Sequence, residues 1–193
     1  MKKILVLLCA TATLSLAAGS ALADSIKGRL GVTGKIGFTI PADGDFGPNN
    51  SSTDTDNGFI GGAGVIYGLD NTIAVEAEIT RSTYGSNIGD FDVTDLSLGA
   101  QYRFALIQPQ LVPYLGVGLD FLMIDADGGR DVDNTFGIHA KAGADYFLMK
   151  QLALTAEAKL LIAPDADING PTGNGNFDPI NFSTTFGARY FFN

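Results

Sequence analysis

The sequence has few of the residues that carry redox, metal or nucleophilic chemistry. It contains one cysteine, Cys9, one histidine, His139, and no tryptophan. Cys9 lies within residues 1–23, which have the order of a secretory signal peptide: two lysines, an apolar stretch and an Ala-Leu-Ala cleavage site. The mature chain, residues 24–193, is expected to be one domain without a thiol, which excludes disulfides and cysteine metal sites.

Positive charge and long apolar runs are also scarce. Without the two signal-peptide lysines, 10 basic residues remain against 21 acidic ones, a balance that argues against a nucleic-acid partner. No later segment approaches the ~18 consecutive apolar residues that a transmembrane helix requires. The 25 glycines and the excess of Asp over Glu favour turns and strands over helices.

The chain does contain a repeated alternation of apolar and polar residues. In residues 181–192, one parity holds Phe182, Phe186, Tyr190 and Phe192, and the other holds Ser183, Thr185 and Arg189, so a strand would place the two sets on opposite faces. Seven further segments alternate similarly, and we predict eight strands, at residues 26–40, 59–67, 73–84, 95–105, 112–124, 135–147, 152–163 and 181–192. Short connectors alternate with long polar loops at 42–57, 85–94, 125–134 and 164–180. That arrangement is typical of outer-membrane barrels.

Charged side chains separate by parity within the predicted strands. Of fourteen charged residues there, only Arg81 shares the apolar parity. A charge facing lipid at the midplane costs about 2–4 kcal/mol, so the separation predicts a lipid-facing exterior and a charged lumen, whereas a soluble barrel would bury the apolar parity. The predicted inward residues, with His139, are Lys27, Arg29, Lys35, Glu76, Glu78, Asp95, Arg103, Asp120, Lys141, Asp145, Glu157, Lys159 and Arg189.

Outward aromatic residues concentrate near both ends of the strands, as interfacial anchoring predicts. Those near the short turns are Tyr67, Tyr102, Phe104, Tyr146, Tyr190 and Phe192, and those near the long loops are Phe38, Phe59, Phe121, Phe136 and Phe182. The predicted fold class is therefore all-β: an eight-stranded antiparallel up-and-down transmembrane β-barrel.

Three segments carry a resemblance to a known family: Gly58-Phe-Ile-Gly-Gly-Ala-Gly-Val-Ile-Tyr67, Pro113-Tyr-Leu-Gly-Val-Gly-Leu-Asp-Phe121 and Phe186-Gly-Ala-Arg-Tyr-Phe-Phe192. The mature chain resembles the small eight-stranded outer-membrane β-barrels, such as the OmpA transmembrane domain, OmpX and the opacity-type surface proteins. The resemblance implies a location in the outer membrane and an assembly signal, read by the barrel-assembly machinery, at Phe186, Tyr190 and Phe192. Asn193 displaces this signal by one residue.

The predicted lumen has two interpretations. Seven cations and six anions face inward, and near-balance favours a structural network that closes the lumen, because unpaired buried charges are costly. The alternative is a narrow gated pore for ions or small solutes. The resemblance also raises a lipid A-modifying enzyme, but the deacylase pattern wants His-x-Ser, and His139 is followed by Ala140 and Lys141.

The long loops are strongly acidic. They contain thirteen Asp residues and one cation, Arg130. Asp125, Asp127, Asp131 and Asp133 only partly match a calcium loop, so we expect a solvated acidic rim with at most weak divalent association beside lipopolysaccharide phosphates. The sequence indicates no cofactor and no catalytic residue. We expect a structural or surface-interaction role, with membrane lipid, lipopolysaccharide and a host or surface ligand at the loops as partners.

Overall fold

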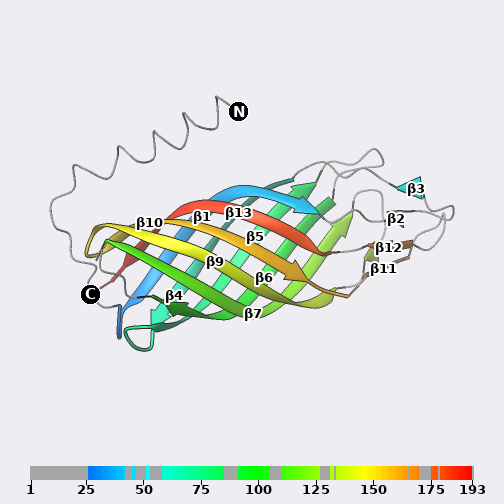
Figure 1. Ribbon diagram of the computed structural model, residues 1–193. Coiled ribbons are helices and arrows are strands. Elements are labelled where there is room, and N and C mark those ends of the chain that lie inside the picture. Colours follow the sequence, from blue (N-terminus) through cyan, green and yellow to red (C-terminus); the bar gives the residue numbers. More distant parts are fainter. Residues whose placement is uncertain are drawn as a thin grey trace, which may run out of the picture.

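The computed structural model describes residues 26–41, 45–46, 51–52, 58–84, 91–104, 110–126, 131–132, 134–164, 166–169, 175–177 and 179–192. Eight long strands form a closed barrel in which β1 pairs with both β4 and β13, and every pairing is antiparallel (Figure 1). These strands are β1 (Leu30–Pro41), β4 (Gly58–Gly68), β5 (Ile73–Tyr84), β6 (Phe91–Arg103), β7 (Leu111–Ala126), β9 (Thr135–Met149), β10 (Leu152–Ile162) and β13 (Asn181–Phe191). The predicted fold class is confirmed.

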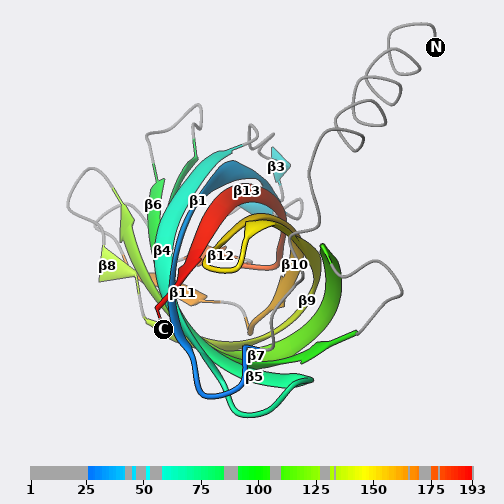
Figure 2. The same cartoon turned by 90° about the vertical axis from the view of Figure 1, so that its left-hand side faces the viewer.

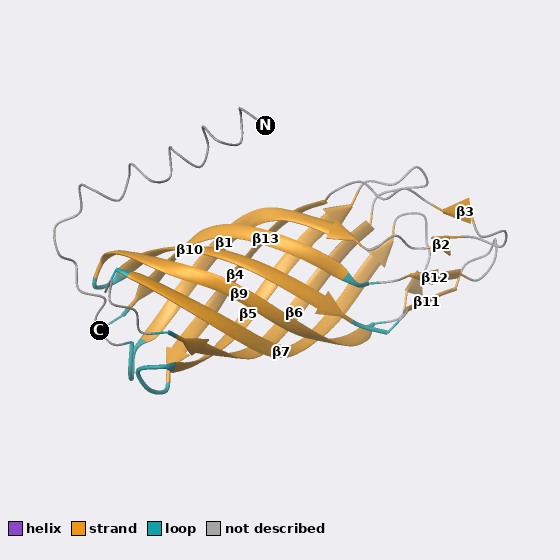
Figure 3. Cartoon of the chain, in the orientation of Figure 1, coloured by secondary structure: helices purple, strands orange, loops and turns teal. Residues whose placement is uncertain are grey.

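Five short strands were not predicted, and all lie beyond the long-loop end of the barrel. They are β2 (Asp45–Phe46), β3 (Ser51–Ser52), β8 (Asp131–Val132), β11 (Ala166–Asn169) and β12 (Gly175–Phe177). β2 pairs with β3, and β11 pairs with β8 and β12. They are too short for an alternating pattern to be recognised in the sequence. Figure 3 shows the described residues as strands and loops. None of them forms a helix long and apolar enough to cross a membrane.

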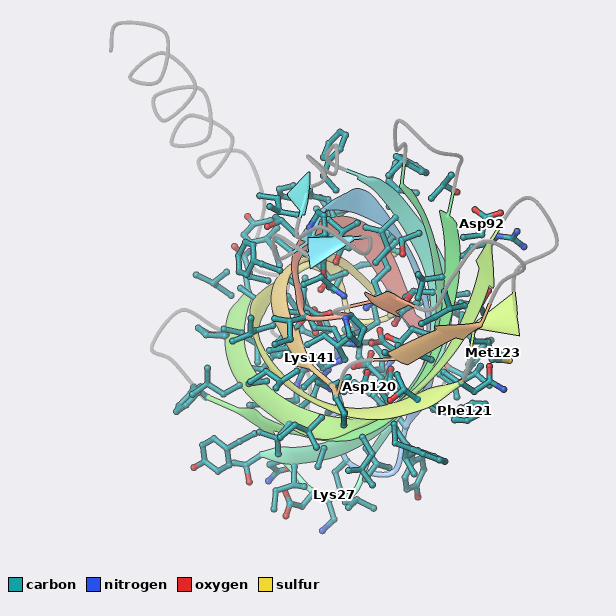
Figure 4. All side chains as sticks on the ribbon, turned by 90° about the vertical axis from the view of Figure 1, so that its right-hand side faces the viewer. Lys27, Asp92, Asp120, Phe121, Met123 and Lys141 are labelled. Atoms are coloured by element: carbon teal, nitrogen blue, oxygen red, sulfur yellow. The ribbon has the colours of Figure 1, made fainter. Side chains whose placement is uncertain are left out.

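Inward and outward side chains alternate along the strands of the barrel, as the sequence pattern predicted. Asp120 points into the lumen while its neighbour Phe121 points outward (Figure 4). On the outer face Val117 is 66 % exposed and Phe136 is 71 % exposed, whereas the inward Lys35 is only 7 % exposed. The outward apolar surface is therefore continuous around a lumen that holds the charges.

Outward aromatic rings pair near both ends of the strands. Phe121 and Phe136 lie 4.9 Å apart near the long loops, and Tyr190 and Phe192 lie 5.3 Å apart near the short turns. Aromatic pairs favour offset-stacked or edge-to-face geometry; the second pair is edge-to-face at 78°, and the first is tilted at 48°. The two groups of rings suit the two membrane interfaces.

The short turn between β4 and β5 is fixed by one side chain. The Asp70 carboxylate accepts hydrogen bonds from the backbone N–H groups of Thr72, at 2.6 Å, and Ile73, at 2.7 Å. These bonds lower the pKa of Asp70 below its ordinary value, and the bond from Thr72 has the largest effect. The hydroxyl of Thr72 adds a third bond of 3.0 Å.

The chain enters the barrel differently from the prediction. The first strand was expected from residue 26, but β1 begins at Leu30. Gly28 has a φ of 72°, in the left-handed region that favours glycine, and this breaks the extended conformation. Residues 26–29 therefore turn across the short-turn mouth of the barrel, where Ile26 is only 4 % exposed.

Candidate functional site: a filled lumen

An apolar plug closes the short-turn end of the lumen. It consists of Ile26, Ile66, Ala74, Phe147, Ala153 and Phe191. The rings of Phe147 and Phe191 stack with their centroids 5.8 Å apart and an interplanar angle of 20°. Figure 2 views the barrel from this end. Phe147 and Phe191 have the inward parity of the charged residues, so the alternation is consistent with their position in the plug.

Arg29 was predicted to join the interior ion network, but it binds backbone carbonyls at the short-turn end of the barrel instead. Its guanidinium donates to the backbone carbonyls of Lys150, at 3.0 Å, and of Phe191 and Phe192, at 3.3 Å each. It also lies 5.5 Å from the centroid of the Phe191 ring. Lys27 likewise precedes β1 and bridges to Gly68. Both residues precede β1, which begins at Leu30, and both lie outside the lumen.

Above the plug lies the arginine half of an ion network. Asp145, which has no exposed surface, accepts a 2.6 Å hydrogen bond from Arg103 and a 2.9 Å bond from Arg189. Arg189 also donates to Glu76 at 2.6 Å. The two guanidinium groups lie 5.7 and 5.6 Å from the centroid of the Tyr114 ring. Two buried cations therefore share one carboxylate and lie against the same tyrosine ring.

Two lysines extend the same network toward the long loops. Lys141 donates to Glu76 at 2.6 Å and to Glu78 at 3.2 Å. Lys35 donates to Glu78 at 2.5 Å and to Glu157 at 2.9 Å. We call this connected set the main cluster, and it holds four cations and four carboxylates: Lys35, Arg103, Lys141, Arg189, Glu76, Glu78, Asp145 and Glu157.

A second set, the outer cluster, consists of Asp95, Asp120, His139 and Lys159. Lys159 donates to Asp95 at 2.7 Å and to Asp120 at 2.6 Å. Nδ1 of His139 lies 2.7 Å from Asp120. Two carboxylates thus share one lysine. Among the described residues, the buried polar side-chain atoms without a hydrogen-bond partner are Oδ1 of Asp95 and Nε2 of His139.

Glycines on neighbouring strands provide the space for these inward side chains. A Cβ atom on Gly118 would lie 2.5 Å from Cε1 of His139, and one on Gly143 would lie 2.5 Å from the Tyr114 ring. Both distances are shorter than van der Waals contact. Nε2 of His139 also faces Gly99, where an added Cβ would be 3.2 Å away.

The geometry of the lumen suits a structural role. Breaking a buried ion pair by removing one partner costs about 3–5 kcal/mol, and every carboxylate of the main cluster contacts at least one cation. A histidine acting as a general base needs a free nitrogen near its substrate. One nitrogen of His139 is bound to Asp120, and the other is enclosed against Gly99.

The remaining predicted site residues lie near the C-terminus and at positions 125–133. Phe186, Tyr190 and Phe192 face outward and are 59 %, 44 % and 45 % exposed. Asp127, Asp133 and Asn193 lie outside the described residues, and of Asp125 and Asp131 only the backbone is described, in β7 and β8. In the part of the chain that the structure describes, no group of His, Cys, Asp or Glu could hold a metal ion.

Structural comparison gives neighbours of the same architecture. OprG from Pseudomonas aeruginosa is 16 % identical with a TM-score of 0.68, over 86 % of this chain and 96 % of OprG. Neisserial surface protein A is 18 % identical with a TM-score of 0.68, over 84 % and 97 % of the two chains. AlkL, solved in lipid bilayers, is 19 % identical with a TM-score of 0.64, over 92 % and 95 %. At these identities the likeness shows the fold.

The sequence itself places the chain in a family. A search of curated protein sequences gave no match. The model of the outer membrane protein β-barrel domain matches residues 9–190, a span that includes seven strands of the barrel and all of β13 except its last residue, Phe191. The protein therefore belongs to the outer membrane protein β-barrel family, and its place is the cell outer membrane.

Proposed function

We propose that this outer-membrane barrel has a structural or surface-interaction role, exercised through its acidic long loops. The observation that carries the proposal is the filled lumen. The apolar plug, the main cluster and the outer cluster lie one after another along the barrel. An eight-stranded barrel is just wide enough for side chains to fill it, so the surfaces left for partners are the loops and the lipid-facing exterior.

The loops would supply the interaction surface. Their thirteen Asp residues against one Arg favour a partner with a basic surface and a salt-dependent association. One structural neighbour is named a surface protein, neisserial surface protein A, which fits a role at the cell surface. Membrane lipid and lipopolysaccharide would surround the barrel, and the barrel-assembly machinery would insert it.

The test replaces the thirteen loop Asp residues with Asn and leaves the lumen unchanged. Cells of a Gram-negative strain express either form, and gels of heat-modifiable mobility check that both contain equal amounts of folded barrel. The cells are then scored for adherence to a cultured epithelial layer and for survival in bile salts. We expect the loop variant to adhere less while bile-salt survival is unchanged. Equal adherence of the two forms would show that the acidic loops do not carry an interaction.

The narrow pore is the competing function, and the structure provides the variant that tests it. Conduction requires a path past the stacked rings of Phe147 and Phe191. We expect purified protein to give no conductance steps in planar bilayers, and the double substitution Phe147→Ala and Phe191→Ala to introduce them. Steps in the unmodified protein would replace the structural role with a pore.

A further inference from the structure

A groove lies on the lipid-facing side of the barrel, over β5, β6 and β7 near their short-turn ends. Its lining consists of Ile73, Ala100, Gln101, Tyr102, Leu115, Gly116 and Val117. Ile73 is the first residue of β5, and Tyr102 is the last but one of β6. Because outer-membrane barrels have their short turns on the periplasmic side, the groove lies in the leaflet that faces the periplasm.

The walls of the groove include three side chains of one outward row. Tyr102 pairs with Ile73 on one side and with Leu115 on the other, and all three side chains are exposed on the outer face. The ring of Tyr102 packs edge-to-face against Phe104, with the centroids 5.0 Å apart and an interplanar angle of 74°. This contact holds the Tyr102 ring at the end of the groove nearer the short turns.

The floor of the groove is low because its residues have little outward bulk. Ala100 has only a methyl group there, beside Val117, its partner on β7. In the row between Ala100 and Tyr102, Gln101 pairs with Gly116. The side chain of Gln101 is buried in the lumen, and Gly116 has none. The floor therefore consists of the Ala100 methyl group and the backbone of β6 and β7.

The size and the chemistry of the groove suit hydrocarbon. Its volume is ≈ 350 Å³, whereas a dry cavity of about 150 Å³ is already large enough to bind benzene. None of the residues that line it is charged, and its exposed wall is almost entirely apolar. A polar ligand would lose its hydrogen bonds to water there without replacement, so the groove matches an alkyl chain.

The backbone around the groove is already ordered. The amide of Arg103 donates to the carbonyl of Thr72 at 2.6 Å, and the amide of Phe104 donates to the carbonyl of Pro113 at 2.8 Å. The hydrogen bonds between the strands therefore continue past the end of β6 on both sides. Binding sites are usually largely preformed, and a ligand would not need to order this backbone.

The position of the groove decides between two occupants, a lipid chain and a second copy of the barrel. Seven residues line it, far fewer than the ~20–30 residues per side of a stable protein interface. The outer face of this outer-membrane protein lies in lipid, which supplies alkyl chains. Tyrosine rings prefer the membrane interface, so Tyr102 marks the end of the groove at which a lipid headgroup would lie.

We propose that this groove is a specific binding site for one acyl chain of a phospholipid from the periplasm-facing leaflet. The chain lies over Ala100, between Tyr102 at its headgroup end and the side chains of Leu115 and Val117. Because the groove encloses the chain on more than one side, the bound phospholipid leaves the barrel more slowly than the lipid around it.

The experiment is native mass spectrometry of the full mature barrel, released from nanodiscs of palmitoyl-oleoyl phosphatidylglycerol. The collision energy is raised until the loosely held lipid has left, and the lipid that remains on the folded barrel is counted. We expect one phospholipid per barrel to remain. A barrel that loses all its lipid in one continuous series, or that leaves the nanodisc as a dimer without lipid, would overturn the proposal.

Matched variants locate the bound chain. Ala100→Phe fills the floor of the groove from the lipid side, so the retained phospholipid should be lost, and Ala100→Val, which fills less, should retain a smaller fraction than the unmodified barrel. Ala188→Phe makes the same change two residues before Tyr190 on β13, outside the residues that line the groove, and should retain the phospholipid. Heat-modifiable mobility checks that each variant is folded. Equal retention in the unmodified barrel and both Ala100 variants, or equal loss in Ala188→Phe, would refute the site.

Discussion

Asp145 is the residue whose loss should be most costly to the barrel. Its carboxylate accepts from Arg103 at 2.6 Å and from Arg189 at 2.9 and 3.2 Å, and it has no exposed surface. Asp145→Asn keeps the shape but leaves the main cluster with four cations and three carboxylates. Because an uncompensated buried charge costs about 3–5 kcal/mol, we expect the free energy of unfolding to fall by that amount.

The assay is urea unfolding in lipid vesicles, followed by heat-modifiable gel mobility and circular dichroism, since the protein has no tryptophan. The double variant Asp145→Asn with Arg103→Gln restores the balance and should recover part of the loss. Asp92→Asn, which removes the partner of the exposed Arg81, should cost about 1 kcal/mol or less. A loss at Asp145 no larger than at Asp92, or a double variant as unstable as the sum of its parts, would refute the reasoning.

Three further predictions use the same unfolding assay. Gly143→Ala should destabilise by about 1–3 kcal/mol, because its Cβ would lie 2.5 Å from the Tyr114 ring, whereas Gly34→Ala has nothing within 4 Å and should be neutral. Asp70 has a lowered pKa, so the ionised carboxylate adds to the free energy of unfolding at pH values above the ordinary Asp pKa. This contribution is lost as the pH falls through the lowered pKa, and Asp70→Asn should remove this part of the pH dependence. Val117→Arg, on the lipid face, should cost about 2–4 kcal/mol; a neutral result would place this strand outside the hydrocarbon.

The sequence was sufficient to predict the barrel because membrane strands alternate strictly. Lipid excludes charge from one parity, so the inward position of residues such as Lys35 and Glu157 followed from their spacing alone. The second strand, whose glycines weaken the pattern, was also found, as β4 at Gly58–Gly68. The short strands at the loop end could not be predicted, since two to four residues show no period.

The partners within the lumen could not be predicted, because parity gives a direction but no distance. Arg29 has inward parity, yet the turn at Gly28 places it at the mouth, bound to backbone carbonyls. The division into a main cluster and an outer cluster depends on strand tilt and stagger. The apolar plug was visible in principle, since Phe147 and Phe191 have the parity of the charges.

The interior ion pairs also have a consequence for strand register. A strand that slips by two residues keeps its apolar side chains toward lipid, so the membrane alone does not distinguish the slipped barrel from the correct one. The same slip moves every inward charge by about 7 Å along its strand, which separates pairs such as Arg189 with Glu76, now 2.6 Å apart. The charges come from seven of the eight strands. These charges can therefore be buried as pairs only when the strands are in the correct register. A barrel in the wrong register would be recognisable by unpaired charges in its lumen.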